Sequence, residues 1–145
     1  MAKALIIAAM LALAGADAAA AATQSPATVG ELLDSGGKQL TGGEITRLFA
    51  GATIGGPALN QPDAKFQVKY LTNGTAAGEV SSAGGSTQLT GTWSANQNNQ
   101  YCQDLRTAQG MPIQGCFYYF TIGNRLFMAT ANGRPTPILE RQVTR

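Results

Sequence analysis

The chain has 145 residues, a net charge of +2 and no histidine. A chain of this length suits one domain once an export segment is removed. The absence of histidine excludes Ser-His and Cys-His catalytic pairs and the commonest general base, and two cysteines are too few to replace histidines in a zinc site. We therefore expect no metal and no cofactor. No basic stripe is present, so the sequence does not predict nucleic-acid binding.

The N-terminal region has the three parts of a secretory signal peptide. Met1-Ala2-Lys3 is a short basic start, residues 4–14 form an apolar run, and small residues continue to Ala22. The apolar run is shorter than the ~20 residues that a membrane-spanning helix needs. We expect cleavage after Ala22, with Ala18 as the alternative site. Residues 1–22 are therefore the predicted signal peptide, and the mature chain is predicted to be periplasmic or secreted, with no membrane span.

Export determines what the two cysteines can do, because disulfides persist in oxidising compartments. Cys102 and Cys116 allow only one pairing. We expect a disulfide between them, with two free thiols as the alternative. Removal of residues 1–22 takes away one basic and one acidic residue, so the mature chain keeps its net charge of +2.

Two short helices are predicted before the strands begin. Residues 23–39 form a leader with one short helix, in which Thr28-Val29-Gly30-Glu31 has the form of a capping box and Gly36-Gly37 ends the helix. Thr41-Gly42-Gly43-Glu44 repeats the capping-box form. It is followed by Ile45, Leu48 and Phe49, whose spacing places them on one helical face.

From residue 52 onward the pattern changes to short strands separated by turns. Residues 66–70 alternate apolar and polar side chains, as a half-buried strand does. Asn73-Gly74 follows, a strong hairpin signal. Further strands are predicted over residues 75–82, 87–95, 101–107, 115–122, 125–131 and 136–143, with turn residues between them.

These strands predict a mainly β fold, an antiparallel meander of about seven or eight strands. The connections are tight, so neighbouring strands should pair in sequence order. Curling hides the two edges of such a meander. We therefore expect residues 40–145 to form a single small barrel or rolled sheet, with the N-terminal helices plugging or covering one end.

Aromatic residues gather in the C-terminal half and occupy both faces of the predicted strand 115–122. One face should line the core, and the other is either an exposed binding groove or simply the rim of the core. Arg106 and Arg125 are expected near this surface, where they could hold an anionic group or be ordinary solvated residues. The candidate binding surface consists of Trp93, Tyr101, Arg106, Phe117, Tyr119 and Arg125.

The acidic residues of the mature chain are scattered, and two of them are already explained as helix caps. They show no calcium-loop spacing. We expect them to be solvated surface groups rather than a catalytic pair. They are Glu31, Asp34, Glu44, Asp63, Glu79, Asp104 and Glu140.

The chain resembles a family of small exported proteobacterial proteins that are catalogued as a domain of unknown function. The resemblance covers about residues 40–133. The pieces that carry it are Leu40-Thr41-Gly42-Gly43-Glu44-Ile45, Gly51-Ala52-Thr53, Asn73-Gly74, Gly91-Thr92-Trp93, Cys102 and Cys116. This resemblance implies an exported β domain but does not imply any particular activity.

The Gly91-Thr92-Trp93 motif is also similar to the Gly-x-Trp motif of lipocalins. Lipocalins carry it on their first strand, whereas here it lies in the middle of the chain. What this similarity implies is architectural: rolled antiparallel sheets often hold a ligand or present a binding face.

The sequence leaves three functional hypotheses. The first is a non-catalytic exported binding module for a small apolar or amphipathic ligand or an envelope component. The second is a structural or inhibitory domain that binds a protein partner in the cell envelope. The third is an uncharacterised enzyme that works without histidine, which would need an unusual acid–base set.

Overall fold

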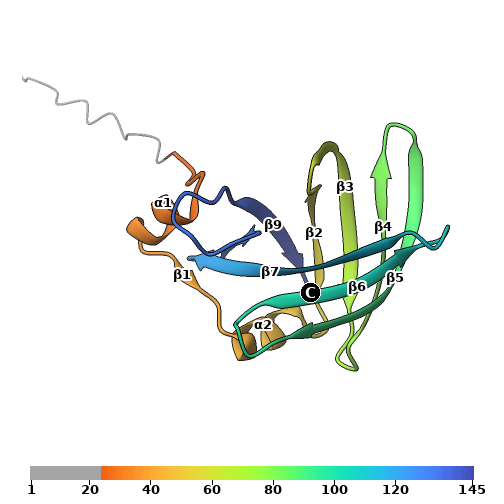
Figure 1. Cartoon of the computed structure of the whole chain (residues 1–145), viewed down its shortest axis with the longest axis horizontal. Helices are drawn as coiled ribbons and strands as arrows, with labels where there is room; N and C mark the ends of the chain where they lie inside the picture. The colour runs from red at the N-terminus through yellow and green to blue at the C-terminus, as the bar shows by residue number, and fades with distance from the viewer. Residues whose placement is uncertain (1–23) are drawn as a thin grey trace, which may run out of the picture.

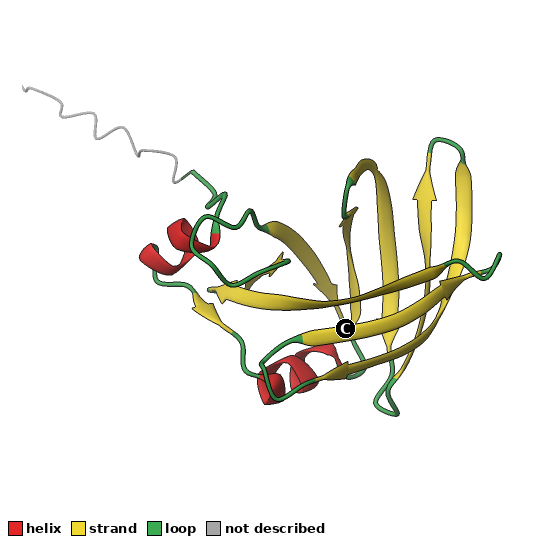
Figure 2. Ribbon diagram, viewed as in Figure 1, coloured by secondary structure: helices red, strands yellow, loops and turns green. Residues whose placement is uncertain are grey.

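The computed structural model describes residues 24–145, and the predicted signal peptide lies outside these residues. The described chain is mainly β, as predicted (Figure 1). Its helices and strands, coloured by type in Figure 2, are α1 (Val29–Asp34), β1 (Lys38–Gln39), α2 (Gly42–Phe49), β2 (Thr53–Ala58), β3 (Gln61–Tyr70), β4 (Thr75–Ser82), β5 (Gly85–Ala95), β6 (Tyr101–Thr107), β7 (Pro112–Ile122), β8 (Arg125–Ala129) and β9 (Leu139–Thr144).

The strands β2 to β9 form a closed antiparallel barrel, which confirms the predicted meander. Neighbouring strands pair in sequence order, and the barrel closes where β9 pairs with β2. Strand β7 pairs with β6 over residues 112–117 and with β8 over residues 118–122. The short strand β1 pairs with β7 beyond the end of β6. Closure gives each barrel strand two partners, which removes the edges on which other chains could add.

Helix α2 closes one end of the barrel, as expected. Its first turn is held by a full capping box: the Thr41 hydroxyl accepts from the Glu44 backbone N–H, and the Glu44 carboxylate accepts from the Thr41 N–H. The Lys38 ammonium donates to the same carboxylate, and these hydrogen bonds lower the pKa of Glu44 to about 2. The helix buries Ile45 and Phe49 against the barrel interior.

Helix α1 lies elsewhere than predicted, because it packs on the outer face of the barrel and not over its end. Val29 and Leu32 contact Phe120 and Phe127, whose side chains point outward from β7 and β8. The Val29 backbone N–H also donates to the Thr136 carbonyl at 2.9 Å. The physical reason is that β7 and β8 carry large apolar side chains on both faces, so their outer face also has to be covered.

Two glycines allow close backbone approach where β4 meets β3 and where β5 meets β6. A Cβ on Gly78 would overlap the carbonyl oxygen of Gln67, and a Cβ on Gly91 would overlap that of Asp104. The backbones therefore approach so closely that no side chain fits between them. Glycine inside a strand commonly marks a position where another backbone segment approaches this closely.

The disulfide joins Cys102 and Cys116, as predicted. The two residues lie directly opposite each other on β6 and β7, and their Cα atoms are 4.0 Å apart. Both face the outside of the barrel, since their neighbours Tyr101 and Phe117 pack toward the core. The bridge thus links two successive strands across the hairpin loop that contains Met111.

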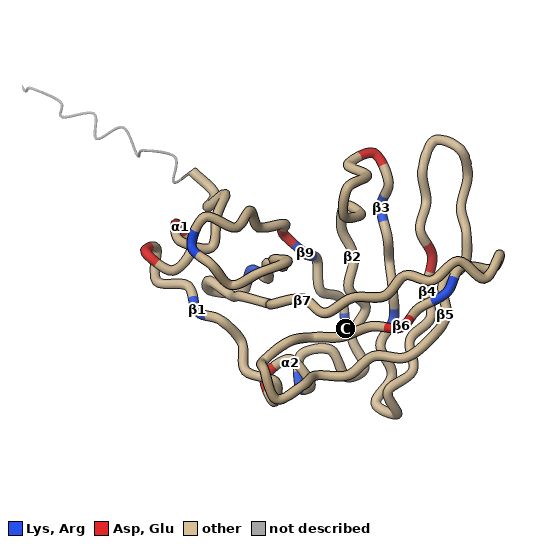
Figure 3. The backbone as a smooth tube through the Cα atoms, in the orientation of Figure 1, with Lys and Arg blue, Asp and Glu red and all other residues tan. Residues whose placement is uncertain are grey.

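Charged residues are spread along the described chain and do not gather in one region (Figure 3). Within residues 24–145, ion pairs join Lys38 to Glu44, Arg125 to Glu140 and Arg134 to Asp34. Within residues 24–145 no helix is both long and apolar enough to cross a membrane.

Loss of the disulfide should lower thermal stability. In the chain-entropy model, closing a loop of this length stabilises the folded state by about 3 kcal/mol, which corresponds to about 10 °C in melting temperature for a domain of this size. Strong reductant should therefore lower the melting temperature of the wild-type chain in differential scanning calorimetry. The double variant Cys102→Ser, Cys116→Ser should melt at the lower temperature with or without reductant. An unchanged wild-type melting temperature under reductant would show that the bridge contributes nothing.

Substitution of Gly91 should cost far more than substitution of a glycine in an open turn. Gly91→Ala places a Cβ against the Asp104 carbonyl, and we expect the free energy of unfolding to fall by about 2 kcal/mol or more. Gly84→Ala is the matched control, because its nearest neighbour, the Ser82 hydroxyl, would lie 3.8 Å from the new Cβ. Urea unfolding of both variants measures the difference. Equal stability of the two variants would contradict the close approach of the backbones at Gly91.

Candidate functional site

The barrel interior contains a cavity of about 680 Å³. Its walls are mainly apolar and come from the inner faces of the strands. At the rim lie the hairpin tips that join β2 to β3, β4 to β5 and β6 to β7, at the end of the barrel away from α2 (Figure 1). Leu59 and Met111 lie at this rim, and Met111 is 63% exposed. The wall side chains include Phe66, Val68, Val80, Leu89, Leu105, Ile113, Phe117 and Met128.

Phe49 of α2 fills the opposite end of the barrel with an aromatic cluster. Its ring stacks on Tyr101, with ring centroids 4.7 Å apart. It meets Tyr70 edge-on at 4.9 Å and Tyr119 edge-on at 5.0 Å. Trp93 completes the cluster at 5.9 Å, and its indole N–H donates to the Leu71 carbonyl. Interactions of this kind each contribute about 0.5–1.5 kcal/mol beyond simple burial, so this end is firmly closed.

Tyrosine hydroxyls form a polar layer between this aromatic cluster and the apolar walls. The Tyr101 and Tyr70 hydroxyls are hydrogen-bonded at 3.1 Å, and the Tyr101 hydroxyl donates to the Gln103 side-chain oxygen at 2.9 Å. Burial raises the pKa of Tyr70 to about 12 and raises the pKa values of Tyr101 and Tyr119 as well. These hydroxyls therefore remain protonated donors at physiological pH.

Arg141 of β9 is the charged side chain that borders the cavity. It is only 4% exposed. Its Nη1 donates to the Pro57 carbonyl at 2.7 Å, its Nη2 contacts the Met128 sulfur at 3.5 Å, and its guanidinium lies 4.9 Å from the centre of the Phe66 ring. A Cβ on Gly56 would lie 3.0 Å from Nη1, so the glycine leaves room for the guanidinium. Burial lowers the pKa of Arg141, and the nearby Tyr119 hydroxyl opposes that shift.

The residues of the predicted binding surface fall into two groups. Tyr101, Phe117 and Tyr119 lie together inside the barrel, and Trp93 lies with them at the closed end. Arg106 and Arg125 lie on the outer face instead, where Arg125 pairs with Glu140 and sits over the Phe127 ring at 5.0 Å.

Sequence reasoning missed Arg141, the arginine that does border the cavity. A signal for it exists in the strand pattern. Arg141 shares its face of β9 with Leu139 and Val143, whereas Glu140 and Gln142 alternate to the other face. A cation on the apolar face of a strand points to an inward-facing charge.

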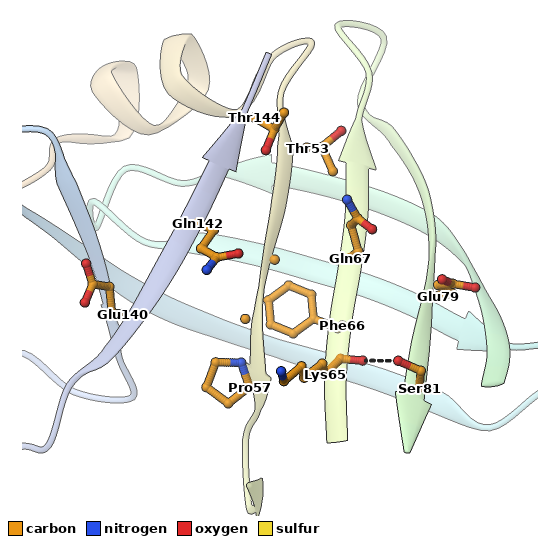
Figure 4. A pocket seen from close by; sticks show the side chains of 12 residues that line it. Thr53, Pro57, Lys65, Phe66, Gln67, Glu79, Ser81, Glu140, Gln142 and Thr144 are labelled. Carbon is orange, nitrogen blue, oxygen red and sulfur yellow. Dashed lines mark hydrogen bonds between the residues drawn. The ribbon is translucent and has the colours of Figure 1, made fainter. Parts of the chain in front are cut away.

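A second hollow of about 680 Å³ lies on the outer face of β2, β3, β4 and β9 (Figure 4). Gly55 and Gly56 leave this part of the surface without side chains. The surrounding side chains are mostly polar, with Lys65 between Glu79 and Glu140 in the drawn view. Ser81 donates to the Lys65 carbonyl at the edge of this hollow. Charges of both signs alternate here, so the hollow favours no single class of ligand.

Tyrosine ionisation tests the polar layer inside the barrel. The three interior tyrosines have raised pKa values, so folding favours their protonated form, and the free energy of unfolding should fall as pH rises above the unfolded value of about 10. Near-ultraviolet absorbance of the folded chain at about pH 11 should show well under half of the tyrosine ionisation that the denatured chain shows. Ionisation of all four tyrosines near pH 10 in a chain that stays folded would contradict this placement.

Among residues 24–145, no group of three or more His, Cys, Asp or Glu side chains is arranged to hold a metal ion. Comparison with known proteins adds no relative: no protein-family model, no curated protein and no solved structure matches this chain. The resemblance to the family of exported proteobacterial proteins therefore stays a prediction.

Proposed function

We propose that this chain is a non-catalytic exported binding module that holds a small apolar or amphipathic ligand inside its barrel. The observation that carries the proposal is the cavity of about 680 Å³. Its size falls within the range of about 300–1,000 Å³ that small-molecule sites in proteins occupy. Its mainly apolar walls, with polar side chains among them, also match the composition of such sites.

Two features support export to the periplasm or the medium. Residues 1–22 have the signal-peptide pattern. The disulfide between Cys102 and Cys116 suits an oxidising compartment. A binding module outside the cytoplasm would encounter lipids and other amphipathic molecules of the envelope.

The chemistry of the cavity supports binding more than catalysis. In the part of the chain that the structure describes, no Asp or Glu lines this cavity. The tyrosine hydroxyls there are protonated, and burial holds their pKa values far from physiological pH. A general base needs a pKa near the working pH, so these hydroxyls suit hydrogen bonding to a ligand.

Filling the cavity should abolish binding of an apolar probe. N-phenyl-1-naphthylamine, which fluoresces strongly in apolar surroundings, should bind the wild-type chain and raise its melting temperature. Val80→Trp places a large side chain in the cavity wall and should reduce probe affinity at least about tenfold, which is 1.4 kcal/mol. Fluorescence titration measures the affinity.

Ala77→Trp is the matched control, because Ala77 lies on the outer face of the same strand and is exposed. It should bind the probe as the wild type does. Circular dichroism establishes that both variants are folded. Absence of probe binding to the wild type, or equal loss in both variants, would overturn the proposed function.

A further inference from the structure

Arg141 brings an unneutralised positive charge into the barrel. Its side chain is almost fully buried beside the cavity. Removal of a charged group from water is strongly unfavourable unless an opposite charge or a full set of hydrogen bonds compensates for it. The groups around the guanidinium therefore indicate which kind of ligand group it can bind.

The described residues supply no carboxylate for this charge. The ion pairs found in residues 24–145 use Lys38, Arg125 and Arg134 as their cations, and Arg141 takes part in none of them. Its sequence neighbour Glu140 lies on the other face of β9, where it borders the outer hollow and pairs with Arg125 (Figure 4).

The guanidinium also keeps donors available. An arginine has five N–H groups in a planar fork that matches a carboxylate. Contacts with the Pro57 carbonyl and the Met128 sulfur occupy one N–H on each Nη atom. Within the described chain, Nε is buried and has no hydrogen-bond partner. The Tyr119 hydroxyl lies near the guanidinium, which can donate to its oxygen, and its own O–H is a further donor.

The cavity thus combines mainly apolar walls with one buried cation and the hydroxyls of Tyr70 and Tyr119. We propose that it binds an apolar molecule headed by a carboxylate, and that the carboxylate pairs with Arg141. This inference rests on the proposed function and names its class of ligand. The carboxylate supplies the missing negative charge, and the hydrocarbon part lies against Val68, Leu89 and Leu105. A charge-assisted pair of this kind is about twice as strong as a neutral hydrogen bond.

Two probes with the same chain and different heads test the inference. Decanoate carries a carboxylate, and 1-decanol carries a neutral hydroxyl on the same ten-carbon chain. Displacement of N-phenyl-1-naphthylamine should show that decanoate binds the wild-type chain at least about tenfold more tightly than 1-decanol. This comparison needs no variant, so it does not depend on how any substitution affects folding.

Arg141→Met removes the charge while keeping an apolar side chain of similar length. It should abolish the preference for decanoate and leave the affinity for 1-decanol within about twofold. Arg141→Lys keeps the charge and should retain part of the preference. Arg47→Met is the matched control, because Arg47 is an exposed residue of α2, and it should keep the wild-type preference.

The outcomes separate this inference from the proposed function. The carboxylate inference would be wrong if the wild type bound decanoate and 1-decanol equally, or if Arg141→Met kept the preference for decanoate. Neither result would contradict the proposed binding module. Failure of both compounds and of the fluorescent probe to bind the wild type would overturn both proposals.

Discussion

The packing of Phe49 among Tyr70, Tyr101 and Tyr119 is the contact on which the shape of this molecule depends. A closed eight-stranded sheet without an end cover would surround a space accessible from both ends. One helix of eight residues covers one end here, and its capping box holds the helix start at Thr41. The result is a barrel with an aromatic floor and a cavity whose rim lies at the other end.

The interior above this floor combines apolar walls with a few buried polar groups, and that combination links the fold to the proposed function. Tyrosine hydroxyls and the buried Arg141 lie inside, while aliphatic and aromatic side chains form most of the wall. Buried polar groups are stabilised when they are hydrogen-bonded to one another. Tyr70 and Tyr101 meet this condition through their mutual hydrogen bond and Gln103, whereas the buried Nε of Arg141 has no partner in the described structure. A ligand with a complementary head would complete the polar layer.

Much of the barrel was predictable from local pattern, and the remainder depends on contacts between distant residues. The bounds of β4 and β6 match the predicted strands 75–82 and 101–107, because alternation and turn residues define them locally. Strand β2 was not predicted, since Gly55, Gly56 and Pro57 are poor strand formers and β2 is held between β3 and β9. Period-2 alternation separates two faces without showing which one is inside. The interior position of Tyr101, Phe117, Tyr119 and Arg141 could therefore be assigned only once the barrel structure was known.

The position of a bound ligand tests this account most directly. Nuclear Overhauser effects between N-phenyl-1-naphthylamine and the side-chain methyl groups report which face of the sheet the probe contacts. A probe bound inside the barrel should give cross-peaks to Val68, Leu89 and Leu105 and none to Ala77 on the outer face. Cross-peaks confined to outward-facing residues such as Ala77 would contradict it.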